Sequence, residues 1–161
     1  MAIQPFQRIL QIADAEESLL ADVHLRLADC YYMNKSFENA RNQYQWTIDR
    51  NLNHADYALM QKGMIQGFLN QEKDKVQTLQ LLSEKFPSSP YSDQALFEKG
   101  VTQQQDLDDP NSAIKSFDQL VREYPQSKYR VASLMRLGLI FFNKSNEDKA
   151  LSYYKQVVRI S

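Results

Sequence analysis

The feature that most constrains this chain is a helical pattern that recurs along its 161 residues. Ala113, Phe117 and Leu120 are spaced by four and three residues, which places all three on one face of an α-helix. The same order of a small, an aromatic and an apolar or small residue recurs at 40–47 and 150–157, and residues 75–82 carry a weaker copy. Self-similarity at this period predicts a stack of similar helix pairs.

A small residue lies in the middle of the helix that precedes each copy of the pattern. These residues are Ala28, Gly63, Gly100 and Gly138, at separations of 35, 37 and 38 residues. Glycine inside a helix costs about 1 kcal/mol relative to alanine. Its regular return therefore predicts close approach of a neighbouring helix at each of these positions.

The segments that connect successive pairs also repeat, because 86–91 and 124–129 both place an aromatic residue and a proline before a serine. We expect Ser89 and Ser127 to cap the helices that follow them. We also expect Pro90 at the first helical position, where its missing N–H is tolerated.

These signals predict one array over residues 1–161, with a second helix of an incomplete repeat at 2–12 and complete pairs at 16–51, 54–86, 90–123 and 128–160. Phe6, Ile9 and Leu10 of the leading helix are expected to pack on the first complete pair. The array opens halfway through a repeat and lacks an evident polar cap, so we expect a fragment of a longer array, or ends that a partner covers, and self-association through those ends. The expected helices span 16–33, 37–51, 54–70, 73–86, 90–105, 110–123, 128–143 and 147–160.

Composition limits the classes of partner. With 19 Lys and Arg against 20 Asp and Glu and no basic stripe, the chain is not expected to bind nucleic acid. Apolar runs such as 137–142 are far shorter than the roughly 20 residues that cross a bilayer, so no direct membrane insertion is expected. Protein or peptide ligands remain.

Chemical motifs are sparse. His24 and His54 have no Cys or carboxylate at ligand spacing, and Cys30 has no adjacent base, so we expect no catalytic site, no metal and no cofactor. The acidic residues at 106–109 lack the spacing of a calcium loop, and we interpret them as a solvated turn in which Asp109 caps a helix. The chain is therefore not expected to be an enzyme.

The pattern resembles the tetratricopeptide-repeat (TPR) family. The best match is the fourth repeat, and closing prolines stand at 87 and 125; the fourth-repeat residues are Leu134, Leu137, Gly138, Phe141, Ala150, Tyr154 and Val157. The resemblance implies an all-α, right-handed superhelix of antiparallel helix pairs, about four and a half repeats with nine helices. The connector Tyr-Pro-x-Ser-x-Tyr is similar to the connectors of TPR proteins of the bacterial envelope, namely the outer-membrane assembly lipoprotein and the TPR partner of the Tol-Pal system. A periplasmic or envelope-associated location is implied.

Several positions depart from the family pattern. None of the first helices carries the early Trp of the family; the residues at that position are His24, Leu59, Leu96 and Leu134. Lys62 and Lys99 replace an apolar residue, Gln66 and Gln103 replace an aromatic residue, and Lys75 replaces the small residue of a second helix. The middle two repeats are therefore expected to pack less regularly than the outer ones.

In TPR folds the first helices line a groove, and the resemblance places an apolar set of side chains there. The predicted groove residues are Tyr57, Met60, Met64, Phe68, Phe97, Val101, Met135, Leu139 and Phe142, with a more polar set in the first pair at Asp22, Leu25, Asp29 and Tyr32. The leading hypothesis is a non-catalytic protein–protein interaction scaffold that binds a peptide or helix in this groove. The alternative is a structural segment whose groove is filled by its own longer chain or by a second copy.

Overall fold

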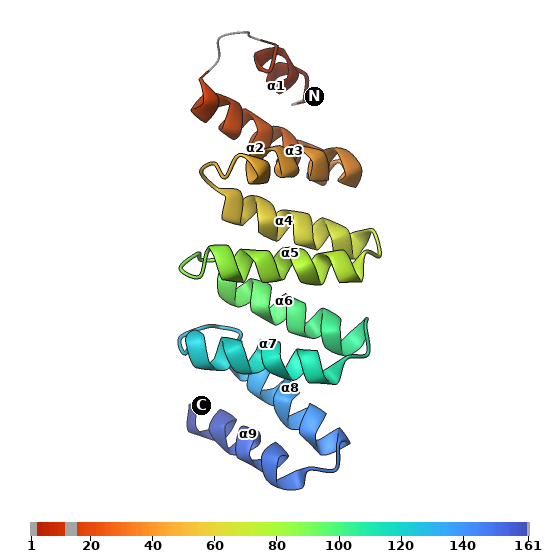
Figure 1. Cartoon of the computed structure of the whole chain (residues 1–161), viewed down its shortest axis with the longest axis vertical. Coiled ribbons are helices and arrows are strands. Elements are labelled where there is room, and N and C mark those ends of the chain that lie inside the picture. The colour runs from red at the N-terminus through yellow and green to blue at the C-terminus, as the bar shows by residue number, and fades with distance from the viewer. Residues whose placement is uncertain (1–2, 12–15, 161) are drawn as a thin grey trace. The chain divides into compact units, whose positions relative to one another are not determined.

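The computed structural model describes residues 3–11 and 16–160, and within these residues the chain forms nine helices and no strand (Figure 1). The predicted all-α class is confirmed. Ala2, the first residue of the expected leading helix, lies outside the described residues. The helices are α1 (Ile3–Ile9), α2 (Glu17–Met33), α3 (Phe37–Asp49), α4 (Ala55–Phe68), α5 (Glu72–Lys85), α6 (Ser92–Gln105), α7 (Pro110–Glu123), α8 (Arg130–Asn143) and α9 (Glu147–Ile160).

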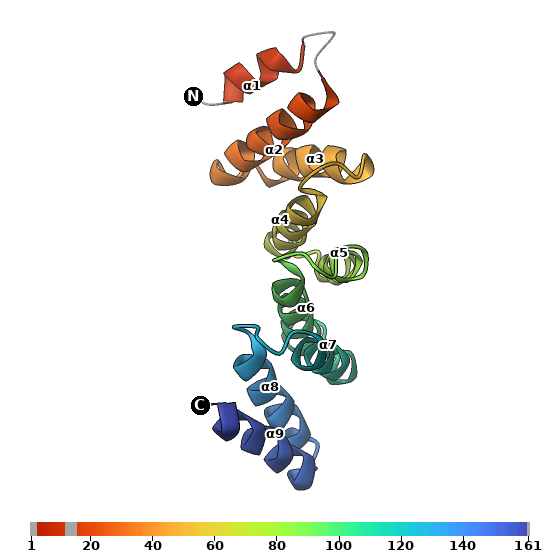
Figure 2. The same ribbon diagram turned by 90° about the vertical axis from the view of Figure 1, so that its left-hand side faces the viewer.

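The chain forms two compact units, Met1–Leu82 and Ser83–Ser161. In the first unit α2 packs antiparallel to α3, and α3 packs on α4. In the second unit α6 pairs with α7 and α8 pairs with α9, as Figure 2 shows from the side. Each pair is a hairpin of two helices joined by a short turn, which is the predicted unit.

Each repeated glycine lies where a side chain of the second helix meets the first. A Cβ added at Gly63 would lie 2.8 Å from Leu79 Cδ2, and one at Gly100 would lie 2.6 Å from Phe117 Cε1. A Cβ at Gly138 would overlap the ring of Tyr154. The predicted close approach is confirmed, and the approaching helix is the partner within the same pair.

The turns inside the pairs share one backbone conformation. Lys35, Asn70, Asp108 and Ser145 all have φ between 49° and 57°, in the left-handed region. In three of these turns the N–H of the following residue donates to a carbonyl five residues back, as from Asn146 to Phe141. This closure satisfies a carbonyl at the helix end and turns the chain into the second helix.

The connectors between pairs differ from the prediction. Pro90 does not open a helix, because α6 begins at Ser92 and Pro90 lies in the preceding turn. Ser89 Oγ accepts from the N–H of Tyr91, and Ser127 Oγ accepts from the N–H of Tyr129, before the helix begins in each case. The two serines therefore order the turn and do not cap the helix, because a backbone turn intervenes between serine and helix.

The leading helix is shorter than predicted and ends at Ile9. Phe6, Ile9 and Leu10 are half-buried, and α1 packs on α2. Gln7 Nε2 donates to the Tyr31 hydroxyl at 3.0 Å, which adds a polar contact between the two helices. Among the described residues, no helix is both long and apolar enough to cross a membrane.

Gly100→Ala is expected to destabilise the chain by about 1–3 kcal/mol, because the new methyl group meets the fully buried ring of Phe117. Gly67→Ala is the matched control, since its Cβ would lie 3.2 Å from the flexible Lys75 Cδ and the change removes a helix-interior glycine. That variant should stay within about 0.5 kcal/mol of wild type or exceed it. Urea unfolding followed by circular dichroism measures both, and equal stability of the two variants would contradict the packing role of Gly100.

Candidate functional site

Helix α8 presents a row of large apolar side chains to solvent. Val131, Met135, Leu139 and Phe142 follow one another at spacings of four, four and three residues, and so lie on one face of the helix. Their exposed fractions are 38%, 47%, 47% and 60%. Three of the four are predicted groove residues, and the structure brings them together on α8. We call these four side chains the α8 stripe.

The predicted groove residues of α6 are covered. Phe97 and Val101 are half-buried, and the Phe97 ring stacks on Tyr129 at a centroid distance of 5.0 Å. The Arg136 guanidinium lies 5.7 Å from the centroid of the Phe97 ring, and its Nη1 donates to Gln104 Oε1 at 2.9 Å. This part of the predicted groove is an intramolecular contact between neighbouring first helices.

The predicted groove residues of α4 are divided between core and surface. Met60 is buried in the core, Met64 is half-buried, and Tyr57 is half-buried against α2 and α3. Phe68 is exposed at the end of α4, where its ring stacks on Phe37 at 5.2 Å. Of these residues, only Phe68 presents most of its side chain to solvent.

Asp29, expected on the polar part of the groove, ties three helices together. Its Oδ1 accepts from the Tyr44 hydroxyl of α3 at 2.6 Å and from the Tyr57 hydroxyl of α4 at 2.9 Å. Burial, and then the hydrogen bond and charge of Asp29, raise the pKa of the Tyr44 hydroxyl above its ordinary value. Asp29 therefore acts as a structural acceptor and is already occupied.

Asp29→Ala is expected to lower the free energy of unfolding by about 1–3 kcal/mol, because it leaves the hydroxyl of the fully buried Tyr44 without its acceptor. Asp22→Ala is the control, since Asp22 forms only an exposed ion pair with Arg26 on the same helix. Thermal unfolding of both variants tests this assignment. If the two losses are equal, Asp29 does not hold the three helices together.

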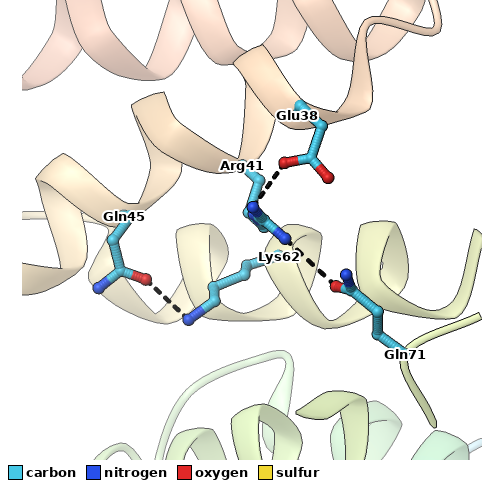
Figure 3. A network of polar contacts seen from close by, with 5 residues as sticks. All are labelled: Glu38, Arg41, Gln45, Lys62 and Gln71. Carbon is cyan, nitrogen blue, oxygen red and sulfur yellow. Dashed lines mark hydrogen bonds and ion pairs between the residues drawn. The ribbon is translucent and has the colours of Figure 1, made fainter. Parts of the chain in front are cut away.

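A polar hollow between α3, α4 and α5 was not predicted. It measures about 430 Å³ and is lined by Arg41, Asn42, Gln45, Lys62, Gln66, Asp74, Gln77 and Thr78. Figure 3 shows Arg41 between Glu38, at 2.5 Å, and Gln71, at 3.2 Å, while Lys62 Nζ points to Gln45 Oε1 at 2.7 Å. The sequence signal was the pair of departures at Lys62 and Gln66, which place polar atoms where the family has apolar ones.

Lys62 and Gln66, the two residues of α4 that depart from the family pattern, both place a polar group in surroundings that disfavour it. Burial holds the pKa of Lys62 below its ordinary value and Arg41 lowers it further, while Asp49 and Asp74 oppose the shift. Gln66 is 5% exposed, and its Oε1 has no hydrogen-bond partner. The equivalent Gln103 of α6 does have one, because Ser116 Oγ donates to its Oε1 at 2.6 Å. The hollow is thus polar and charged, unlike the α8 stripe.

The individual side chains that could act in catalysis or metal binding lie in surroundings that explain them structurally. The His24 ring stacks on Trp46 at 3.8 Å, and its Nδ1 lies 2.6 Å from Gln43 Oε1. Cys30 is half-buried and makes no disulfide. Asp109 caps α7 as predicted, accepting from the Ser112 N–H at 3.0 Å. In the part of the chain that the structure describes, no group of three His, Cys, Asp or Glu side chains is placed to hold a metal ion.

The stability of the α2–α3 contact is expected to fall at acidic pH. Burial, together with the charge of Arg50, lowers the pKa of His24 in the folded state below 6.5, although the bond to Gln43 opposes this. The unfolded chain then binds the proton more readily, so the contribution of His24 is complete above about pH 6.5 and is lost as pH falls through the folded-state pKa.

We expect unfolding curves of wild type and His24→Gln to differ in their pH dependence below about pH 6.5. His54→Gln is the control, because His54 is exposed. Identical pH profiles for wild type and His24→Gln would contradict this assignment.

Comparison with known families and structures agrees with the predicted stack of helix pairs. Two tetratricopeptide-repeat family models match residues 94–127 and 131–161. The crystal structure of MamA superposes with a TM-score of 0.74 at 16% identity, over 98% of this chain and 85% of that one. The chain has a tetratricopeptide-repeat fold. In TPR terms α2, α4, α6 and α8 are the first helices of the repeats, and α3, α5, α7 and α9 are the second helices.

Two further solved structures show the same TPR fold. YrrB, described as a TPR protein with an unusual peptide-binding site, superposes with a TM-score of 0.67 at 17% identity, over 99% of this chain and 76% of that one. A MamA structure from Desulfovibrio magneticus RS-1 gives 0.64 at 14% identity, over 97% and 83%. Comparison with curated proteins finds no match to this sequence.

Proposed function

We propose that this TPR chain is a non-catalytic scaffold that binds a peptide or helix of another protein on the exposed apolar face of the first helix α8. The observation that carries the proposal is the α8 stripe, in which Met135, Leu139 and Phe142 each expose about half of their side chain. Contiguous apolar side chains on a helix face are typical of a surface that recognises a helix in a groove.

The side-chain chemistry of the stripe suits recognition. Methionine is unbranched and polarisable, so Met135 adapts to differently shaped ligands. Leu139 and Phe142 supply the larger apolar area. Burying apolar surface contributes about 25 cal/mol of favourable free energy for each Å² removed from water. The similarity in fold to YrrB, a protein with a peptide-binding site, is in keeping with this proposal.

A second candidate is that another part of a longer parent chain, or a second copy, fills the same face. The observation that favours it is the contact between α6 and α8, where Phe97 and Val101 are covered by a helix of the same chain. The oligomeric state tests the second-copy case, because a second copy makes self-association depend on the α8 stripe.

Leu139→Glu is expected to leave the fold intact and abolish peptide binding. Leu139 is 47% exposed, so the change in stability should stay within about 0.5 kcal/mol. The measurement is fluorescence anisotropy with a helical peptide that wild type selects from a display library, alongside thermal unfolding. Lys115→Glu, at an exposed position of α7, is the control and should bind normally. If the Leu139→Glu variant folds and binds the peptide as tightly as wild type, the α8 stripe is not the binding surface.

We also propose an envelope or periplasmic location. Its support is the Tyr-Pro-x-Ser-x-Tyr connector at 124–129, which is similar to that of envelope TPR proteins. Fractionation of the source cells with an antibody to the chain tests it, and recovery in the cytosolic fraction alone would exclude it.

A further inference from the structure

The polar hollow between α3, α4 and α5 lies on the side of α4 that faces away from the predicted groove. Lys62 and Gln66 line it, and each stands two residues after a predicted groove residue, Met60 or Met64. Two residues turn an α-helix by about 200°, so the two sets of side chains point in nearly opposite directions. The hollow measures about 430 Å³, within the range of about 300–1,000 Å³ that is typical of small-molecule sites.

A buried hydrogen bond of the third repeat is missing at the equivalent place beside this hollow. In the third repeat, Ser116 Oγ donates to Gln103 Oε1 at 2.6 Å. Thr78 and Gln66 stand at the equivalent positions of the second repeat, 38 and 37 residues earlier, and both line the hollow. Each is 5% exposed, yet Gln66 Oε1 has no hydrogen-bond partner, so the threonine hydroxyl does not donate to it. The hollow therefore has a buried acceptor in its wall that is left without a donor.

An ammonium group and a carboxylate also line the hollow without forming an ion pair. Lys62 Nζ donates to the neutral Gln45 Oε1 at 2.7 Å (Figure 3), and neither Lys62 nor Asp74 forms an ion pair with another described residue. Arg41 is already paired with Glu38, so Lys62 is the cation that remains. Burial and the nearby Arg41 lower the pKa of Lys62, and the charge of Asp74 does not fully offset this. A ligand carboxylate beside Lys62 would stabilise its charged form.

These three groups without partners define the chemistry of a ligand. A carboxylate suits Lys62, an ammonium group suits Asp74, and an N–H donor suits Gln66 Oε1. An anion alone would leave the carboxylate of the hollow unpaired, and a water molecule would leave both charges unpaired. The wall also carries amide groups that can each donate and accept, those of Asn42, Gln45 and Gln77.

From these groups we infer that the hollow binds a free polar α-amino acid, with its carboxylate beside Lys62 and its ammonium group beside Asp74. A peptide carries these two charges at opposite ends, whereas a free amino acid offers both within a hollow of this size. An amide side chain, as in glutamine, matches the amide groups of the wall. This ligand is additional to the peptide or helix of the proposed function, and its site does not include the α8 stripe.

Isothermal titration calorimetry of the full chain with L-glutamine and two analogues tests the inference. Glutaramate lacks the ammonium group, and γ-aminobutyramide lacks the carboxylate. Glutamine is expected to bind at least about tenfold more tightly than either analogue, because each analogue leaves one charged group of the hollow without its partner.

Substitutions in the wall locate the site. Lys62→Gln and Asp74→Asn should each weaken glutamine binding by about tenfold or more, with an unchanged circular dichroism spectrum. Lys115→Gln and Asp106→Asn remove the same charges at exposed positions of α7 and of the turn before it, and should bind as wild type does. Gln66→Phe, which introduces the aromatic residue typical of the family, should fill the hollow and prevent binding.

The outcomes separate the possible occupants. If glutaramate binds as tightly as glutamine, the hollow holds an anion and the amino acid is excluded. If wild type takes up no glutamine at millimolar concentration, water fills the hollow and the inference is overturned. Undiminished binding by Lys62→Gln and Asp74→Asn, or by a folded Gln66→Phe variant, would show that glutamine binds elsewhere. None of these results changes the proposed function, which depends on the α8 stripe.

Discussion

The close contact between the two helices of each pair is the constraint on which the rest depends. A residue without a Cβ at Gly100 or Gly138 admits the ring of Phe117 or Tyr154 from the second helix. The ring fills the space a side chain would take, so the two helices approach closely. Once that distance is fixed, the helical period determines which side chains of the first helix face outward. The direction in which the α8 stripe points is a consequence of this geometry.

The middle repeats show how the same framework tolerates polar groups. Gln103 stands where the family has an aromatic residue, and Ser116 satisfies its carbonyl oxygen inside the core. Gln66 occupies the equivalent position in α4, but its Oε1 has no partner. An unsatisfied buried acceptor costs about 1–3 kcal/mol. Gln66 lines the polar hollow together with Lys62 and Arg41, whereas Gln103 in the third repeat is satisfied by the Ser116 hydroxyl.

Equivalent positions have different roles because the neighbouring helix differs. Phe97 and Met135 occupy the same place in successive repeats, yet Phe97 is stacked under Tyr129 while Met135 is about half exposed. Apolar character alone does not distinguish these cases, since both side chains suit a core and a docking face equally well. The proposed binding surface is the part of the predicted groove that no described helix covers.

The sequence by itself determined the helical pairs, their order and the role of the repeated glycines. The period of 3.6 residues and the turn signals depend only on residues that are close together in the sequence. It also singled out Lys62, Gln66 and Gln103 as unusual. Only the tertiary structure decided that Met60 is core, that Asp29 is held by Tyr44 and Tyr57, and that Phe97 is covered while Leu139 is not. These outcomes depend on contacts between residues that lie a whole repeat apart. A helical period fixes the direction of a side chain on its own helix, whereas exposure depends on what packs against it.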